Sequence, residues 1–197
     1  MSLVDTSVRD LLAAFASSDP TPGGGSASAL ASSVGTSLLT MVAGLPKTRS
    51  SSDEDRVALA AAASSLASIR EQLIDAIDAD AIAYDQVIGA YKRPKASDEQ
   101  KTARTAAIQA ALQGATDVPL RVMRLSAQAL EIATTVAARG HPGASSDVGV
   151  AVALLRAGFE GGRLNVEANL SGIRDDVYTT AVTAEVAVLA ARVSSTV

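Results

Sequence analysis

The sequence predicts an all-α fold, an up-and-down antiparallel bundle of five to seven long helices. No stretch alternates polar and apolar residues for long enough to form a strand, and no Asn-Gly or Asp-Gly hairpin signal occurs. Hydrophobic residues make up 48% of the chain but aromatic residues only 3%, so small aliphatic side chains must fill the core, which suits closely packed helices. Proline and glycine clusters divide the chain into long apolar stretches with short connections, which is typical of a helix bundle.

Start and stop signals place the helices in order. They are expected over residues 5–17, 26–45, 53–91, 97–139, 145–170 and 174–194. The loop 20–25, with two prolines and three consecutive glycines, separates the first two helices. Pro46 and Pro94 end the second and the third. Ser52 or Asp53 is expected to cap the third helix.

The second half of the chain carries further signals. A break or kink is expected near Pro119, because proline removes a backbone donor from the fourth helix. After the connector 140–143, either Ser145 or Ser146 is expected to cap the fifth helix. Gly172 marks the junction with the last helix.

Length and composition restrict the class of protein. A chain of 197 residues suits one domain, here expected over residues 1–197. Seventeen basic and twenty-one acidic residues leave a net charge of -4, which offers no electrostatic surface for nucleic acid or an anionic membrane. The absence of cysteine excludes disulfides, thiolate chemistry and cysteine metal sites, and it fits a cytoplasmic protein.

One segment also has to be weighed as a membrane span. The N-terminus shows no signal-peptide pattern, but residues 20–46 carry no charge and are long enough to cross a bilayer. Seven Ser or Thr residues between Ser26 and Thr40 favour a helix buried in protein instead. We therefore expect no membrane span.

The third helix contains a carboxylate in its apolar stripe. The stripe follows heptad spacing and consists of Leu59, Leu66, Leu73, Ile77, Asp80, Tyr84, Val87 and Tyr91. At 100° per residue Asp80 lies on the apolar face, whereas Asp75, Asp78 and Asp85 project away from it as surface groups. An ionised carboxylate on a packed face costs several kcal/mol unless it is paired, hydrogen-bonded or protonated.

Two interpretations of Asp80 stay open at this point. It is either a structural group that receives a hydrogen bond from a neighbouring helix, or a carboxylate in an apolar pocket. In a pocket, burial raises the pKa of a carboxyl group toward the range useful for acid and base catalysis.

The fifth helix divides into two arcs. One arc is expected to be a solvated face, because its charges are spaced for successive ion pairs: Arg156, Glu160, Arg163 and Glu167. The opposite arc carries Asp147, Gly158, Gly161, Asn165 and Asn169, and its glycines allow another backbone to approach. Asp147 and Asn165 are about 27 Å apart along the helix, so if both act, they contact different parts of a long ligand or sites joined across a subunit interface.

Three polar features have ordinary explanations as well as functional ones. His141 has no second His or Cys beside it, so an exposed loop residue is expected and not a metal site. The cluster 92–95, which includes Lys95, suits a helix C-terminus but could also hold an anionic substrate tail. The glycine run 23–25 is either a flexible loop or a cradle for an anion, and it lacks the ending of a P-loop.

Five separated stretches resemble one family: "TPGGGSASALASSVGTSLLTMVAGL", "IDADAIAYDQVIGAYKRPK", "VPL", "SSDVGVA" and "LNVEANLSGIRDD". They are similar, in order, to the cyclodeaminase domain of formiminotransferase-cyclodeaminase and its stand-alone bacterial relatives, which include methenyltetrahydrofolate cyclohydrolases. The resemblance implies a helical homodimer that acts on a folate one-carbon substrate without a metal or other cofactor. A formiminotransferase is an implied partner.

The resemblance implies one of two reactions. Family members either cyclise 5-formiminotetrahydrofolate to 5,10-methenyltetrahydrofolate with release of ammonia, or hydrolyse the methenyl bridge to 10-formyltetrahydrofolate. We expect cyclisation, with hydrolysis as the alternative and a non-catalytic folate-binding or scaffold dimer as a third possibility. Two departures from the family pattern bear on substrate choice: Pro46 follows Leu45 in place of Thr, and His141 and Gly143 stand where Asn is frequent.

The resemblance also assigns site residues by position. Asp80 is the expected catalytic acid and base. The expected substrate-binding residues are Pro22, Gly23, Gly24, Gly25, Ser26, Tyr84, Lys95, Ser146, Asp147, Asn165 and Asn169. Of these, Asp147 and the two asparagines would orient the pterin or the bridging nitrogens, and Lys95 would help to hold the glutamate tail.

Overall fold

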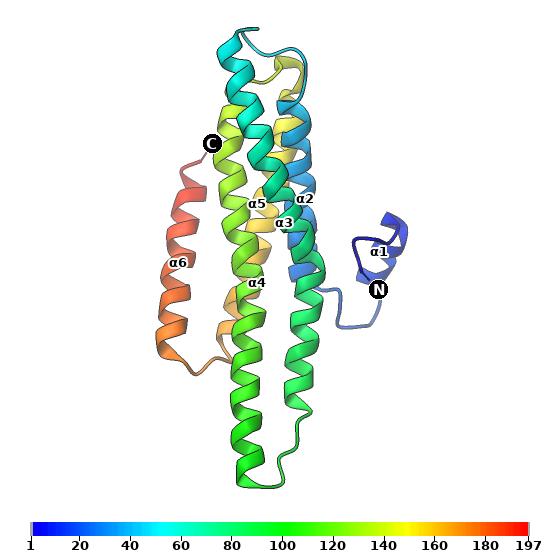
Figure 1. The fold of residues 1–197 in the computed structure, drawn as a ribbon, viewed down its shortest axis with the longest axis vertical. Helices are drawn as coiled ribbons and strands as arrows, with labels where there is room; N and C mark the ends of the chain where they lie inside the picture. The colour runs from blue at the N-terminus through cyan, green and yellow to red at the C-terminus, as the bar shows by residue number, and fades with distance from the viewer. Residues whose placement is uncertain (1, 197) are drawn as a thin grey trace.

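The computed structural model describes residues 2–196, and over this range the chain is helical without a strand. The elements are α1 (Val8–Phe15), α2 (Gly24–Ala43), α3 (Asp53–Tyr91), α4 (Asp98–Arg139), the 3-10 turn η1 (Pro142–Ala144), α5 (Ser145–Leu170) and α6 (Asp176–Ser194). The predicted all-α class is confirmed. α2 to α5 pack as an up-and-down antiparallel bundle, α6 lies along α4, and α1 stands apart from the bundle (Figure 1).

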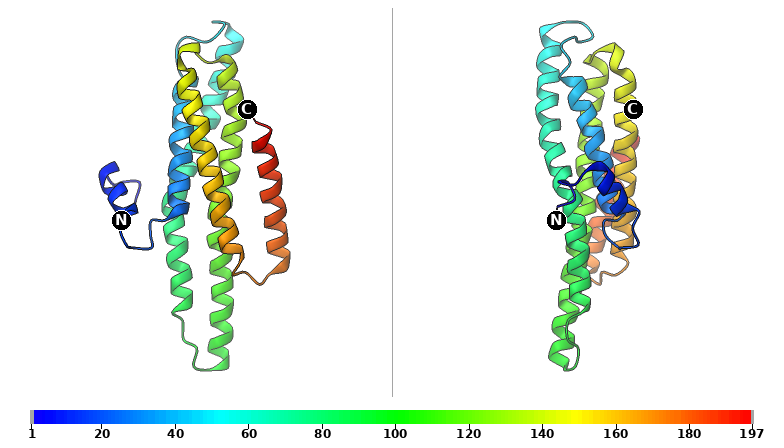
Figure 2. Two further views of the ribbon diagram at one scale, coloured as in Figure 1. Left: turned by 180° about the vertical axis from the view of Figure 1, so that it is seen from behind. Right: turned by 90° about the vertical axis from the view of Figure 1, so that its right-hand side faces the viewer.

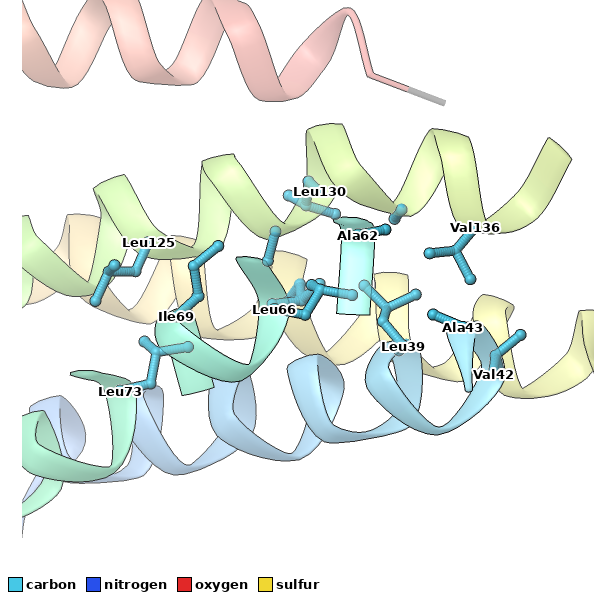
Figure 3. Close-up of a cluster of buried hydrophobic side chains, with 14 of the residues drawn as sticks. Leu39, Val42, Ala43, Ala62, Leu66, Ile69, Leu73, Leu125, Leu130 and Val136 are labelled. Carbon is cyan, nitrogen blue, oxygen red and sulfur yellow. The ribbon is translucent and has the colours of Figure 1, made fainter. Parts of the chain in front are cut away.

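The four bundle helices share one core made mostly of aliphatic side chains. Figure 3 shows Leu39 of α2 beside Leu66 of α3, with Val42 toward one end of the same cluster and Leu73 toward the other, and Leu130 on α4. All five are almost completely buried. A second, smaller cluster around Phe159 joins α4 and α5 to α6. The scarcity of aromatic residues therefore gives a slim core that brings the helices close together.

α2 and α5 pack through small residues. A Cβ added at Gly158 would overlap the Ser32 hydroxyl and lie 2.6 Å from the Ser28 carbonyl oxygen, and one at Gly161 would overlap the Ser28 hydroxyl. Most hydroxyls of α2 donate to a carbonyl one turn earlier in the same helix, as Ser28 does to the Gly24 carbonyl at 2.6 Å, while Ser32 shares a hydrogen bond with Ser126 of α4. Among the described residues no buried side-chain polar atom lacks a partner. The serine-rich sequence of α2 therefore suits an interior helix.

Two helices, α2 and α6, are long and apolar enough to cross a bilayer by composition alone. More than half of the most apolar window of α2 is buried inside the bundle, whereas little of that of α6 is. Core helices of ordinary bundles also meet this criterion, so the two helices are weak support for a membrane span.

Several predicted boundaries are correct, two are wrong, and of the break or kink predicted near Pro119 the break is absent. Ser52 caps α3 as predicted. Gly24 and Gly25 belong to α2 rather than to the preceding loop. α4 passes through Pro119 without a break in helical structure. α5 begins at Ser145, directly after η1, and its N-cap residue is Ala144, so neither predicted serine caps it.

α2 is much shorter than α3 and α4. It begins at Gly24, so α3 and α4 continue below it as a hairpin without its cover (Figures 1 and 2). The upper part of the α3 stripe is closed by the bundle, as shown by Leu66 and Leu73, which have no exposed surface. The lower part is open, because Tyr84 is 38% and Tyr91 49% exposed. Asp80 lies at the boundary.

Candidate active site

Asp80 of α3 caps the start of α2. The backbone amide of Ser26 donates to Asp80 Oδ2 at 2.9 Å. Gly23, the N-cap residue of α2, has no side chain to satisfy the first amides of the helix, so a carboxylate from another helix does so. Oδ1 accepts no hydrogen bond from the described residues. The structural interpretation of Asp80 is therefore correct for one oxygen, while the other oxygen stays free for chemistry.

The Ser26 hydroxyl lies between two acceptors. Its Oγ is 2.8 Å from the Ile77 carbonyl oxygen and 3.2 Å from Asp80 Oδ2. A hydroxyl has one proton, so when Ser26 donates to Ile77 its oxygen can accept a proton from a neutral Asp80. Ser26 can therefore stabilise either protonation state of the carboxyl group.

Burial raises the pKa of Asp80 above its ordinary value, and this effect exceeds that of the two hydrogen bonds from Ser26, which lower it. Desolvation penalises the ionised form, so the carboxyl group binds a proton more readily than an exposed aspartate does. A shift in this direction suits a group that takes up and returns a proton during a reaction.

Gly25 has no side chain, and its absence makes room for the Asp80 carboxylate. A Cβ at this position would overlap the Asp80 carboxyl group, whereas one at Gly24 would approach the Asn165 side chain only to 3.3 Å. Both glycines adopt ordinary helical backbone, so close approach and not backbone freedom explains Gly25.

A cavity of about 320 Å³ opens beside Asp80. This volume is at the lower end of the range for sites that bind small molecules. Its lining comes from the loop before α2 and from four helices: Pro20, Thr21, Gly23, Gly24, Gly25, Asp80, Tyr84, Val87, Leu112, Ala115, Asn165 and Asn169. The only carboxylate in this lining is Asp80, and no lining residue is basic.

Both asparagines of α5 have their amide nitrogens engaged. Asn165 Nδ2 donates to the Gly161 carbonyl of its own helix at 2.8 Å. Asn169 Nδ2 donates to the Ala115 carbonyl of α4 at 2.9 Å. Ala115 is four residues before Pro119, so its carbonyl is the one that proline deprives of a helical donor. Asn169 therefore explains why α4 passes through Pro119 without a break.

The structure brings together most of the predicted site residues. One cavity is lined by seven of them: Gly23, Gly24, Gly25, Asp80, Tyr84, Asn165 and Asn169. Ser26 does not line the cavity but donates a hydrogen bond to Asp80. Leu112 and Ala115 of α4 were missed. The unpaired carbonyl that Pro119 imposes on Ala115 was the signal that could have pointed to that turn.

Four predicted residues lie elsewhere. Lys95 is exposed in the connection between α3 and α4, and Ser146 and Asp147 are in the first turn of α5, at the opposite end from Asn165. Pro22 is buried and lines a second cavity together with Asp78 and Ile82. Their predicted roles in substrate binding stay predictions.

Asp78 is not the simple surface group that was expected. Its carboxylate accepts hydrogen bonds from the Ser2 hydroxyl and the Leu3 amide, both at 2.6 Å. This contact fastens the N-terminal segment to α3. Over residues 2–196, no group of three or more acidic or histidine side chains is arranged to hold a metal ion.

Comparison with known proteins agrees with the resemblance. The sequence profile of the formiminotransferase-cyclodeaminase family matches residues 7–188. The chain belongs to this family. A methenyltetrahydrofolate cyclohydrolase of Methylorubrum extorquens is 39% identical over 171 residues, which cover 87% of this chain and 82% of that protein. The relatives named here are enzymes, and so is this member.

Two further similar proteins show how far the similarity extends in length and in sequence identity. The formimidoyltransferase-cyclodeaminase of Rattus norvegicus is 32% identical over 177 residues, which cover 90% of this chain but 33% of that protein. The chain thus spans about a third of the length of such two-part relatives. The crystal structure of formiminotetrahydrofolate cyclodeaminase from Thermotoga maritima aligns with a TM-score of 0.86 at 24% identity, covering 96% of this chain and 91% of that chain, which shows a shared fold.

Proposed function

We propose that the protein acts on one-carbon derivatives of tetrahydrofolate, with Asp80 as the general acid and base. The observation that carries the proposal is a carboxylate with a raised pKa and one free oxygen, set in the wall of a cavity that fits a small molecule. The names of the relatives support a folate substrate, because both reactions they describe change the bonds of one carbon between two nitrogens.

In the cyclodeaminase reaction, 5-formiminotetrahydrofolate reacts with its formimino nitrogen protonated, so that N10 attacks the formimino carbon, the nitrogen becomes an amino group, and N10 loses its proton to Asp80. The tetrahedral carbon then expels its amino group, which leaves as ammonia after it receives that proton. One carboxyl group thus takes and returns a proton, and 5,10-methenyltetrahydrofolate remains. The two-part relatives favour this reaction. In this assignment a formiminotransferase supplies the substrate.

The second candidate is hydrolysis of the methenyl bridge. Water attacks the bridging carbon and loses a proton to Asp80, and the bond from this carbon to N5 breaks. Asp80 returns its proton to N5, which leaves 10-formyltetrahydrofolate and releases one further proton to solvent. The Methylorubrum extorquens cyclohydrolase favours this reaction, because the two chains align over most of their lengths.

The geometry suggests how a folate would lie. The free Oδ1 of Asp80 would meet the bridging carbon and its nitrogens, with the side-chain oxygens of Asn165 and Asn169 nearby as acceptors. From Asp80 to the end of α3 at Tyr91 is about 16 Å along the helix. A ligand tail along this open stretch would end near Lys95, whose charge suits a glutamate carboxylate. The proposed reaction takes place in the cytoplasm.

Spectrophotometry with both substrates tests the proposal. Methenyltetrahydrofolate absorbance rises, with matching ammonia release, if the protein cyclises the formimino substrate, and falls if it hydrolyses the methenyl substrate. Turnover of either substrate by wild-type protein supports folate chemistry, and the faster reaction identifies the activity. Tight folate binding in calorimetry without turnover of either would contradict the enzymatic proposal and favour a binding or scaffold protein.

A further inference from the structure

Gln109 of α4 forms two hydrogen bonds with the connection between α5 and α6. Its side-chain nitrogen Nε2 donates to the Gly172 carbonyl at 3.0 Å, and its side-chain oxygen Oε1 accepts from the Arg174 amide at 2.7 Å. One side-chain amide thus pairs with two backbone groups. These three residues are here called the Gln109 clamp. The connection that they fasten lies beside α4 in both views of Figure 2.

The same connection packs against Leu112, which lines the Asp80 cavity. A Cβ added at Gly172 would lie 3.1 Å from Leu112 Cδ1, so the backbone of the connection is in direct contact with the leucine. Gln109 and Leu112 are three residues apart and are therefore neighbours on the surface of α4. The Gln109 clamp thus lies beside a residue of the cavity wall.

A second hydrogen bond joins the end of α5 to α4. Asn169 Nδ2 donates to the Ala115 carbonyl at 2.9 Å. Gln109 and Ala115 are six residues apart, which is about 9 Å along α4, and Leu112 is midway between them. Two attachments, one on each side of Leu112, therefore hold this stretch of α4 against the last turn of α5 and the connection after it.

α4 is weak at this level for local reasons. Pro119 cannot donate to the Ala115 carbonyl, so one helical hydrogen bond is missing. The Thr116 hydroxyl donates to the Leu112 carbonyl at 2.8 Å, and bonds of this type often bend helices. α2 begins only at Gly24 and does not cover the stretch of the α3–α4 hairpin beyond it. The two attachments therefore stabilise a stretch that its own helix stabilises poorly.

We propose that Gln109 is a positioning residue of the Asp80 cavity, which fixes Leu112 and the α4 wall at the cavity width that the bound folate requires. The effect of Gln109 on turnover rests on the proposed function. Its effect on the order of α4 does not.

The position of the clamp predicts which kinetic constant it controls. If the wall adopts the binding geometry for only a fraction of the time, the apparent affinity for a ligand falls by that fraction. Asp80 itself is fixed from another side, because it accepts from the Ser26 amide of α2. Loss of the clamp should therefore raise KM and leave kcat nearly unchanged.

Separate contacts attach α6 to α4, so the clamp is not needed for this purpose. The Tyr178 hydroxyl donates to Asp117 at 2.7 Å, and Arg124 forms two hydrogen bonds with Glu185. A substitution at Gln109 thus removes the attachment of the connection at the level of the cavity while α6 stays in place.

Hydrogen exchange tests the clamp without any enzymatic readout. Gln109→Met keeps the length of the side chain but forms neither hydrogen bond, so the amides of residues 109–118 should exchange about tenfold faster than in wild type. Exchange over 125–136, in the core part of the same helix, should not change. The matched control is Gln113→Met, one turn later, where the side chain reaches only Asp175 at 3.4 Å. Unchanged exchange over 109–118, or an equal rise over both stretches, would overturn the clamp.

Steady-state kinetics tests the positioning role. In Gln109→Met the KM for the folate substrate should rise by about tenfold and kcat should stay within about twofold of wild type. Gln113→Met should keep the KM of wild type. A loss of kcat without a change in KM, or the same rise in KM from both variants, would refute the assignment of Gln109.

A double-mutant cycle tests whether Gln109 acts through Leu112. Leu112→Ala removes most of the wall contact itself and should raise KM. Adding Gln109→Met to this variant should then raise KM much less than Gln109→Met does alone. Additive effects would contradict positioning through Leu112. Wild-type protein that turns over neither folate substrate would refute the proposed function instead and leave the hydrogen-exchange result standing.

Discussion

The two halves of α3 carry the same heptad stripe but have different surroundings. Between Leu59 and Ile77 the stripe is buried by the three other helices of the bundle. From Tyr84 to Tyr91 it is partly exposed, because α2 does not extend that far. Asp80 lies between the buried and the exposed part of the stripe. It caps α2, and the start of α2 marks the boundary between the two parts. Periodicity thus identifies the inward side of a helix, while the ends of its neighbours decide whether that side forms core or a cavity.

The largest expected effect comes from Asp80→Asn. Asn preserves the size of the side chain and can still accept from the Ser26 amide, but it cannot take up a proton. General acid and base catalysis contributes about 10²–10⁴-fold, so turnover should fall by at least about 100-fold while the fold and folate binding persist. Asp75→Asn, at an exposed acid of the same helix, is the matched control. Steady-state turnover checks the effect, and wild-type activity in Asp80→Asn would refute the role of Asp80.

The next prediction compares substitutions at two adjacent glycines, Gly25 and Gly24. Gly25→Ala should displace the Asp80 carboxylate and lower turnover by about tenfold or more, as expected for misplaced catalytic groups. Gly24→Ala, whose methyl group meets only Asn165 at 3.3 Å, should weaken folate binding with a smaller change in turnover. Kinetics on both variants tests this order. Equal effects of the two substitutions would show that the glycines serve helix packing alone.

A change in the free energy of unfolding is expected in the buried part of the bundle, where α2 packs against α5. Gly158→Ala places a methyl group against Ser32 and the Ser28 carbonyl, and overpacking of this kind costs about 1–3 kcal/mol. Gly114→Ala in α4 meets nothing within 4 Å and should stabilise the protein by about 0.5–1 kcal/mol, because alanine is the better helix former. Urea unfolding measures both. A neutral Gly158→Ala would mean that the α2–α5 contact is looser than described.

The smallest effect concerns stability against pH. The pKa of Asp80 is raised in the folded protein, so its favourable contribution is present at low pH and is lost as pH rises past the folded value. Asn at this position does not ionise. The unfolding free energy of Asp80→Asn should therefore increase relative to wild type as pH rises, and urea titrations over a pH series measure the difference. A difference that is constant or that decreases would contradict the raised pKa.

Most of the fold follows from local sequence signals, and the exceptions have tertiary causes. Ser52 and Ser97 cap their helices through their own side chains, so sequence alone locates them. The predicted break at Pro119 is absent because Asn169, 50 residues later, donates to the carbonyl that the proline leaves without a donor. No local signal reveals such a distant partner.

Site residues could be predicted from the sequence where a side chain did not suit its position in a helix. Asp80 stands out because a carboxylate interrupts an apolar stripe, and Gly25 belongs to a run that needs explanation. Leu112 was missed because the one sequence signal for this turn of α4, the carbonyl that Pro119 leaves without a donor at Ala115, does not show which helix lies beside it. Lys95 and Asp147 lie outside the cavity of one chain, where helix length separates them from Asp80.

The most direct test of the central claim is a crystal structure with a folate analogue that resists turnover. The account predicts that the bridge between N5 and N10 lies within hydrogen-bonding distance of Asp80 Oδ1, with the glutamate tail directed along α3 toward Lys95. A folate seated instead in the second cavity, against Pro22 and Asp78, with the Asp80 cavity empty, would contradict it.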